Sequence, residues 1–255
     1  MKLLETTGKR VLSTLQGVGE TLILLVRALF WLKGALKYRV ILIEQMLFCG
    51  VESLPVVSIV ALFAGMIVSL QTGTELAKFQ LEGSIGNIVS ASVSREMGPV
   101  FAAIIVAARV GSAMAAQLGT MKVSEEIDAL EAMSIDPVRY LVMPRVWAIL
   151  IMLPILTIYA NLIGILGGAV VGRLQIGVSY YTFFDQVFTN LKVKDIYIGL
   201  LKAGVFALII SSIACHQGLI ARAGARGVGL ATTRTVVFAL MFILMFNYFI
   251  TAIFY

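Results

Sequence analysis

Charged side chains are scarce in this sequence. Asp, Glu, Lys and Arg make up 13% of its 255 residues, whereas 60% of the residues are hydrophobic. Soluble domains average about 25% charged and roughly 45–50% apolar residues. Apolar runs of about 20 residues, the length that crosses a bilayer as a helix, recur here with almost no charge. The scarcity of charge therefore excludes a soluble globular domain and indicates an integral membrane protein.

Cysteine and histidine are nearly absent as well. Cys49 and Cys215 lie in apolar sequence, which argues against a disulfide or a metal site and favours packing roles. The single histidine, His216, has no second histidine or carboxylate at metal-ligand spacing. The sequence also lacks a G-x-x-x-x-G-K-[ST] loop for ATP and a G-x-S-x-G nucleophile elbow. We expect no catalytic residue, no metal and no cofactor in this chain, and hence no enzyme.

Five apolar stretches are long enough to span a membrane. The sequence predicts an all-α integral membrane fold, in which residues 41–255 form one five-span domain with spans at about 41–72, 85–118, 146–172, 196–216 and 235–255. Pro55 and Pro99 are expected to kink the first two spans. Small residues recur at every fourth position in the second and third spans, which predicts close helix packing: Ala103, Ala107, Gly111, Ala115, Gly119, and Gly164, Gly168, Gly172.

Residues 1–40 have a different pattern. Apolar positions recur three and four apart with basic residues among them, and no signal-peptide cleavage site follows: Val11, Leu12, Leu15, Val18, Leu22 and Leu25, with Lys9, Arg10 and Arg27. This pattern predicts a retained amphipathic helix that lies in the membrane interface. Counting Lys and Arg, the N-terminal region and the loops at 119–145 and 217–234 carry 13, whereas the other loops carry four. The imbalance predicts a cytoplasmic N-terminus and a periplasmic C-terminus.

Four ionisable residues fall within or beside the apolar runs. Arg95 and Glu96 are adjacent and point about 100° apart on a helix, so each needs another partner. Asp195 and Lys202 are seven residues apart and share one helix face. Because buried ionisable groups must pair or line a wet cavity, we hypothesise that these four form the polar part of a translocation site; a purely structural set of ion pairs is the alternative. Arg109, deeper in the second span, is expected to snorkel or to pair near the cytoplasmic side.

The segment KVSEEIDALEAMSIDP, residues 122–137, is the least membrane-like part of the chain. It predicts a short helix that Ser124 caps and that Asp136–Pro137 ends. Ile127, Leu130 and Met133 would share one apolar face. The pattern leaves two interpretations open, a solvated loop element or a helix that fits a groove on a cytoplasmic partner.

The block SREMGPVFAAIIVAARVGSAMAAQLGTMKVSEEIDALEAMSIDPVRYLVMPR at 94–145, together with ATTRTVV at 231–237, closely resembles the MlaE family of permeases. The resemblance covers nearly the whole chain. It implies a multi-pass permease of the bacterial inner membrane that forms a homodimer, works with a cytoplasmic ABC ATPase that binds ATP and Mg²⁺, and is capped by a periplasmic MCE-domain hexamer. It allows for a small cytoplasmic STAS-type subunit, involves no nucleic acid, and implies phospholipid as the cargo moved between inner and outer membranes.

The resemblance also assigns residues. It implies that the helix at about 124–134 is a coupling helix that docks on the ATPase through Glu125, Glu126, Ile127, Asp128, Leu130, Glu131 and Met133. It implies that acyl chains bind near the periplasmic end of the first span, at positions matching Val68, Leu70, Gln71, Leu76 and Phe79. Arg95, Glu96, Asp195 and Lys202 fall on the family's polar positions, and residues 1–40 match its interfacial helix.

Three other functions remain open. The cargo of such a permease could be another apolar lipid, such as a sterol or a mycolate-like lipid. The chain could also be a membrane scaffold that anchors an MCE ring without moving a substrate. A small-solute importer is disfavoured because the expected pocket has few polar groups.

Overall fold

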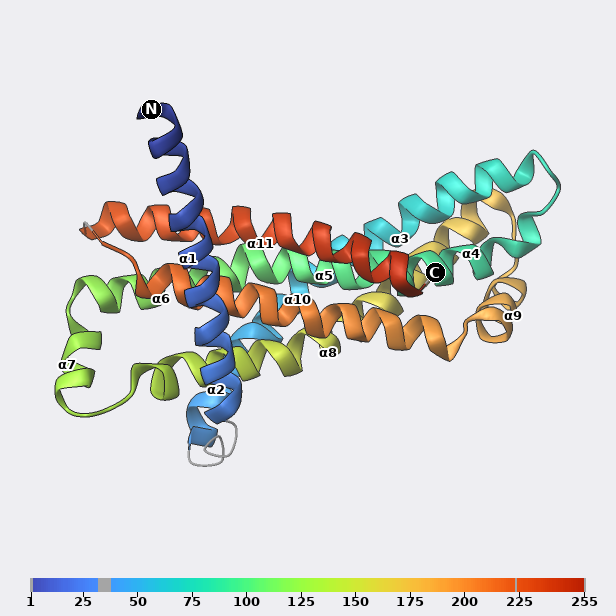
Figure 1. The fold of residues 1–255 in the computed structure, drawn as a ribbon. Coiled ribbons are helices and arrows are strands. Elements are labelled where there is room, and N and C mark those ends of the chain that lie inside the picture. Colours follow the sequence, from blue (N-terminus) through green and yellow to red (C-terminus); the bar gives the residue numbers. More distant parts are fainter. Residues whose placement is uncertain (1, 32–37, 223, 255) are drawn as a thin grey trace.

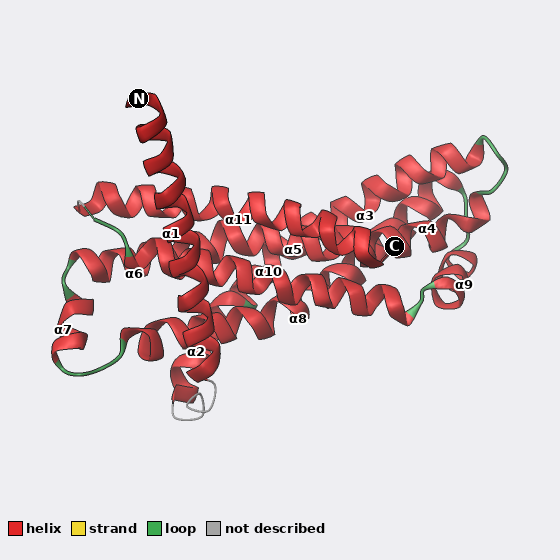
Figure 2. Ribbon diagram, viewed as in Figure 1, coloured by secondary structure: helices red, strands yellow, loops and turns green. Residues whose placement is uncertain are grey.

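The computed structural model describes residues 2–31, 38–222 and 224–254, and of residues 2–15 only the backbone. This part of the chain is helical and contains no strand (Figure 2). Within it, five helical stretches are long and apolar enough to cross a membrane: Arg39–Ala77, Glu82–Val123, Val138–Ile176, Val193–Leu219 and Gly224–Phe254. The predicted fold class, an all-α membrane protein with five spans, is confirmed.

Several spans are built from more than one helix (Figure 1). The first contains α2 (Arg39–Cys49), a 3₁₀ turn (Val51–Ser53) and α3 (Leu54–Ala77). The second contains a 3₁₀ turn (Glu82–Ser84), α4 (Ile85–Ser92), α5 (Gly98–Val106) and α6 (Ser112–Val123), with π turns at Val93–Met97 and Ala107–Gly111. The third contains a π turn (Val138–Val142), α8 (Met143–Val171) and a π turn (Gly172–Ile176), and the last two are α10 (Val193–Leu219) and α11 (Gly224–Phe254).

The helices extend beyond the predicted apolar stretches. The largest difference is at α11, which begins at Gly224 rather than near residue 235, because its first three turns are too polar for a hydropathy criterion but still form helix. Pro55 and Pro99 lie in the first turns of α3 and α5, where proline costs no helical hydrogen bond. The α-helix is interrupted directly before each of them, by a 3₁₀ turn and a π turn respectively.

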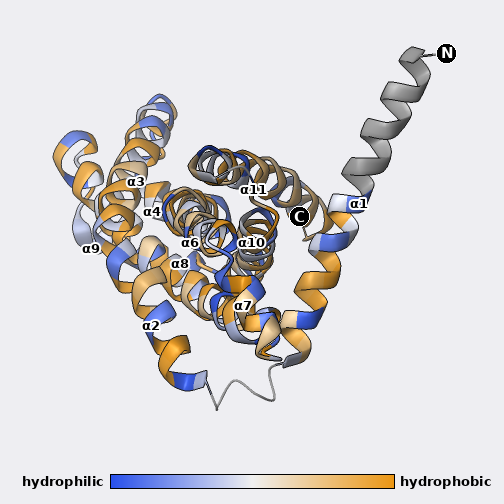
Figure 3. Cartoon of the chain, turned by 90° about the vertical axis from the view of Figure 1, so that its left-hand side faces the viewer, coloured by the Kyte–Doolittle hydropathy of each residue, from blue (hydrophilic) through white to orange (hydrophobic). Residues whose placement is uncertain are grey.

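Small residues bring α3 and α8 into backbone contact. A Cβ atom added to Gly65 would lie 1.9 Å from the carbonyl oxygen of Gly164, and one added to Gly167 would lie 2.4 Å from the carbonyl oxygen of Leu62. The small residues predicted to mediate packing in the second and third spans are all buried. Around the bundle, large apolar side chains such as Phe63 and Leu162 are exposed, as expected where lipid replaces water. Figure 3 shows that hydrophobic residues predominate along the helices.

Helix α1 (Lys2–Phe30) crosses one end of the bundle, the end at which α7 (Glu126–Ala132) also lies (Figure 1). Leu25 and Ala28 pack with residues of α7, α8 and α10. Val18 and Leu22, predicted on the same apolar face as Leu25, are exposed. The apolar positions 11–15 lie outside the described side chains. An interfacial location of α1 thus stays a prediction, and α1 has apolar residues on both its packed and its outward side.

The opposite end of the bundle carries α9 (Tyr180–Asn190), a short helix between the third and fourth spans. Ser179 caps it, because the Ser179 hydroxyl accepts a hydrogen bond from the Thr182 backbone N–H. Phe183 of α9 packs against Ile85 and Val89 of α4. Cys49 and Cys215 are both buried and are not joined in a disulfide.

Candidate functional site

A π turn places Arg95 and Glu96. The turn at Val93–Met97 holds one residue more than an α-helical turn, a feature frequent at functional sites. The two side chains point in different directions, and both reach α10: Arg95 pairs with Asp195, and Glu96 pairs with Lys202. The structure therefore brings together the four ionisable residues that the sequence singled out.

Arg95 binds Asp195 through two parallel contacts. Arg95 Nε lies 2.9 Å from Asp195 Oδ1, and Nη2 donates to Oδ2 at 3.0 Å. The Asp195 side chain is only 2% exposed, whereas that of Arg95 is 35% exposed. Bidentate pairing of this kind fixes the plane of the guanidinium as well as its position. Arg95 is thus held rigidly at a partly open surface.

Lys202 is fully buried, yet its ammonium group has a partner for each of its three hydrogens. Nζ donates to the Arg95 carbonyl oxygen at 3.0 Å, to Glu96 Oε1 at 2.7 Å and to Thr251 Oγ1 at 2.8 Å. A lysine offers three donors and no acceptor, so these contacts satisfy it completely. Lys202 joins α10, the π turn and α11 at one point.

Two residues that sequence analysis missed complete this site. Asn247 Nδ2 donates to Glu96 Oε2 at 2.8 Å, and Thr251 Oγ1 lies 2.9 Å from Glu96 Oε1. Both are on α11, four residues apart and hence on the same side of the helix. Two polar residues at that spacing in an otherwise apolar last span were a usable signal, since polar side chains in membranes gather at helix contacts.

An open groove of about 670 Å³ lies over this network. Its lining combines apolar and polar side chains from α4, the π turn and the end of α11: Asn87, Ile88, Ala91, Ser92, Arg95, Glu96, Met97 and Thr251. Sites for small ligands have a similar character, with apolar walls and a few polar groups that fix orientation. Of the elements that line it, α4 and the C-terminal end of α11 lie toward the end of the bundle opposite α7 (Figure 1).

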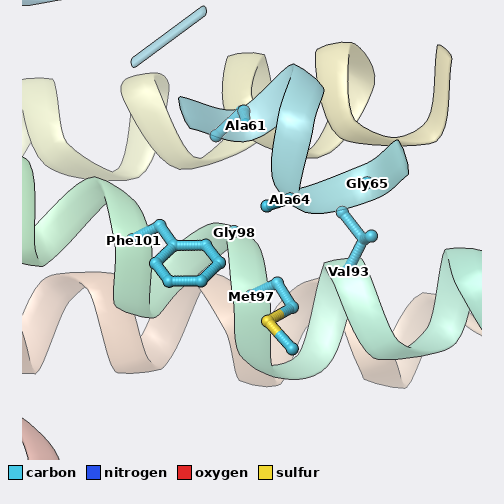
Figure 4. Close-up of a pocket in the computed structure, with 8 residues that line it drawn as sticks. Ala61, Ala64, Gly65, Val93, Met97, Gly98 and Phe101 are labelled. Atoms are coloured by element: carbon cyan, nitrogen blue, oxygen red, sulfur yellow. The ribbon is translucent and has the colours of Figure 1, made fainter. Parts of the chain in front are cut away.

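A second, much smaller cavity lies between α3 and the same π turn. It measures about 10 Å³ and is lined by small and apolar side chains, including Ala64, Val93, Met97 and Phe101 (Figure 4). This volume is about that of one water molecule's probe sphere, far too small for a lipid. The groove, not this cavity, is therefore the candidate binding site.

The five residues matched to the family's acyl-chain site do not share one surface. Val68 and Leu76 are half-buried and pack against the cluster around Ile85 and Val89. Leu70, Gln71 and Phe79 are exposed, and Phe79 is 71% exposed. Their neighbours Glu75 and Lys78 form an exposed ion pair of 2.7 Å with each other. Of the five matched residues, only Leu70, Gln71 and Phe79 are accessible to a ligand in a single chain.

The predicted cap of the helix at about 124–134 is wrong. Ser124 ends α6, and its hydroxyl donates to the Thr120 carbonyl oxygen rather than to α7. The residue that precedes α7 is Glu125, which has φ 59°, a left-handed conformation that breaks the helix there. As a result α7 is shorter than predicted, Glu126–Ala132, and Asp136 instead accepts a hydrogen bond from the Val138 N–H at the next turn.

The apolar face of α7 is turned largely toward the spans. Ile127 is buried, and Leu130 packs with it in a cluster that includes Ala28 of α1 and Cys215 of α10. Met133, predicted on the same face, is 63% exposed. The acidic residues assigned to ATPase coupling are also exposed: Glu125, Glu126, Asp128 and Glu131. A partner that docks on α7 would therefore meet Met133 and carboxylates, while Ile127 and Leu130 attach α7 to the bundle.

The π turns of the described chain share one property: each contains one arginine, namely Arg95, Arg109, Arg139 and Arg173. Arg109 pairs with Glu52 and also donates to the Phe48 carbonyl oxygen at 3.0 Å and to Ser53 Oγ at 2.8 Å. It thereby holds the second span against the α2–α3 junction. The guanidinium of Arg139 lies 4.6 Å from the centre of the Trp31 ring and links the π turn before α8 to the end of α1.

A five-span helical bundle with a buried polar network under a groove at one end and a short protruding helix at the other has the architecture of a transmembrane permease subunit. The comparison with protein families agrees. Residues 42–253 match the family described as permease MlaE, and the chain belongs to this family.

Curated relatives resemble the chain over nearly its whole length. A probable ABC transporter permease protein of Rickettsia bellii is 40% identical over 255 residues, which is all of this chain and 98% of the relative. The intermembrane phospholipid transport system permease protein MlaE of Haemophilus influenzae is 37% identical over 247 residues, 96% of this chain and 95% of the relative. The chloroplastic protein TRIGALACTOSYLDIACYLGLYCEROL 1 of Arabidopsis thaliana is 37% identical over 88% of this chain and 64% of the relative.

Proposed function

We propose that this ABC permease moves phospholipids between the inner and outer membranes of a bacterium, as one half of a homodimer in the inner membrane. The observation that carries the proposal is the groove over the Arg95 and Glu96 network, which offers charged groups beside apolar walls. A phospholipid has the same division between a charged headgroup and apolar chains. The name of the Haemophilus relative supports a phospholipid, and that of the Arabidopsis relative supports a glycerolipid more broadly.

In this proposal the groove of each protomer opens onto a shared pocket between the two copies. Acyl chains contact the outward residues Leu70 and Gln71 of α3 and Phe79 in the turn after it, while Val68 and Leu76 shape the wall behind them. The headgroup lies beside Arg95. Because Asp195 and Lys202 balance Arg95 and Glu96, the four residues carry no net formal charge, an environment that suits a headgroup with charges of both signs.

The motive force comes from a partner, since the chain itself can supply only different affinities for the lipid in two states. A cytoplasmic ABC ATPase, which binds ATP and Mg²⁺, docks on Met133 and the carboxylates of α7. Closure of the ATPase moves α7, and the cluster of Ile127 and Leu130 with α1, α8 and α10 carries that motion into the spans. The lipid pocket then collapses. A periplasmic MCE-domain hexamer, with a small STAS-type subunit on the cytoplasmic side, completes the complex, which has a cytoplasmic N-terminus.

The test is mass spectrometry of lipids that co-purify with the permease and its ATPase, with and without a nonhydrolysable ATP analogue. The proposal expects stoichiometric phospholipid that is released when the analogue binds. A stoichiometric sterol or other apolar lipid would assign a different cargo. The absence of specific lipid in both states would instead support a scaffold that anchors the MCE ring.

A charge exchange tests the residues. Each single variant, Glu96→Lys or Lys202→Glu, should abolish ATP-dependent lipid release, and the double exchange should restore part of it, because the pair is 2.7 Å apart. The same exchanges at Glu75 and Lys78, an exposed pair of equal length, provide the matched control and should leave release unchanged. Release that persists in both single variants at 96 and 202 would contradict the assignment.

A further inference from the structure

One face of α11 carries uncompensated positive charge near its first turns. Arg226 and Arg234 are both exposed, and neither forms an ion pair or hydrogen bond with a side chain in the described part of the protein. From Gln217 to the end of the sequence there is no Asp or Glu, so α11 itself supplies no side-chain carboxylate to neutralise them. The hydroxyls of Thr232 and Thr233, which lie between, bond to the Gly229 carbonyl oxygen of their own helix.

The position of these arginines along α11 matches the boundary of a bilayer. Residues 235–254 contain no charged residue, and this is about the number needed to cross the roughly 30 Å hydrocarbon core. Arg234 therefore lies at the edge of that core. Arg226 is eight residues earlier, about 12 Å farther along the axis. The polar headgroup layer, on the order of 5–8 Å thick, lies between the two Cα positions, so both long side chains can reach its phosphates.

The same face continues as an apolar surface. Leu230, between the arginines, is 49% exposed, and past Arg234 the exposed residues are Val237, Phe238 and Met241. A ligand that fits this face has an anionic group at the arginines and long apolar chains along the next turns. An acidic protein would match the charge but not the exposed apolar continuation, so the face favours a lipid.

We propose that Arg226 and Arg234 form a binding site for an anionic phospholipid of the leaflet at the α7 end of the protein, distinct from the groove at the other end. A guanidinium binds a phosphate through two parallel hydrogen bonds, and two arginines on one side of a helix can hold one headgroup from both sides. The lipid at this site is a resident that anchors α11, not the cargo. It stays bound when the groove empties.

The site can be tested on the full-length permease in nanodiscs of phosphatidylcholine that contain a minor fraction of fluorescent phosphatidylglycerol. Energy transfer from the tryptophans measures enrichment of the anionic lipid around the protein. Each of Arg226→Gln and Arg234→Gln should reduce the enrichment about fivefold, and the double variant more. Arg173→Gln is the matched control: Arg173 is also exposed, but it lies at the other end of the spans, and its loss should change nothing.

The comparison has clear outcomes. Enrichment that falls in the 226 and 234 variants, falls with salt, and does not change when the ATPase and a nonhydrolysable ATP analogue are added supports a resident lipid. Enrichment equal to that of the unmodified protein, or an equal loss in Arg173→Gln, overturns the site. Unchanged enrichment together with weaker binding of the ATPase would assign the arginines to an acidic protein surface instead. A thermal melt of each variant excludes unfolding as the cause.

Discussion

The ammonium group of Lys202 lies 2.7 Å from the carboxylate of Glu96, but the two side chains are buried to different degrees, 0% exposed for the lysine and 35% for the glutamate. Removal of the glutamate leaves a charge inside the bundle that water cannot reach. Removal of the lysine leaves a carboxylate that still has Asn247, Thr251 and the groove. Loss of the Glu96 carboxylate should therefore lower the stability more than loss of the Lys202 charge.

We expect Glu96→Ala to destabilise the protein by on the order of 3 kcal/mol, and Lys202→Met, which removes the charge but fills the space of the lysine stem, by clearly less. Thermal unfolding of the purified protein in detergent measures both. Glu75→Ala, which breaks the exposed pair with Lys78, serves as the control and should cost less than about 1 kcal/mol. Equal losses at 96 and 202 would show that the burial difference does not govern stability.

Gly65→Ala should separate α3 from α8. The new methyl group would meet the carbonyl oxygen of Gly164 at 1.9 Å, and backbone cannot move aside as a side chain can. We expect a loss of about 1–3 kcal/mol in a thermal melt, typical of overpacking. The control is Gly204→Ala in α10, where an added Cβ has no neighbour within 4 Å and should leave stability unchanged or slightly raised. A Gly65→Ala protein as stable as that control would refute the close contact.

Arg109→Lys should be costly although it keeps the charge. Arg109 uses both terminal nitrogens, one toward the Phe48 carbonyl oxygen and Ser53, the other toward Glu52. A single ammonium group cannot reproduce that fork. We expect the free energy of unfolding to fall by about 1–3 kcal/mol. Arg173→Lys, at an exposed site without such contacts among the described residues, should change it by less than about 0.5 kcal/mol.

Two substitutions, one in α7 and one directly after it, should separate docking from folding. Met133→Glu places a charge on an exposed side chain, so the melting temperature should hold while ATPase binding weakens by on the order of 1 kcal/mol. Ile127→Glu places a charge in the buried cluster with Ala28 and Cys215 and should lower the melting temperature itself. Full ATPase binding and full ATP-dependent transport in Met133→Glu would argue against docking at this residue.

Hydropathy was sufficient to predict the five spans, because in lipid every crossing segment must be a long apolar helix. It could not place the start of α11 at Gly224, since residues outside the hydrocarbon core need not be apolar. The sequence identified Arg95, Glu96, Asp195 and Lys202 as a polar set from their cost in an apolar run. It did not give the pairing, because spacing along one helix says nothing about which residue of another helix lies opposite.

The errors at α7 and the omissions on α11 have local causes. Ser124 fitted a capping pattern, but the positive φ of Glu125 ends one helix and starts another at that residue, and propensity does not foresee such a conformation. Asn247 and Thr251 were passed over because uncharged polar residues are common in spans, and only the nearby Glu96 carboxylate reveals their role. Leu130 and Met133 were predicted to share one docking face. Leu130 instead packs against the bundle, and only Met133 is exposed.

The π turn at Val93–Met97 also bears on how such a site originates. Loss of one residue there would restore an ordinary α-helix and rotate one half of the second span by about 100° relative to the other. Arg95 and Glu96 could then no longer both face α10. In a helix that already carries these side chains, a single-codon insertion can thus turn both toward their partners on α10, and a homologue with a one-residue gap at this place should have lost the pairing.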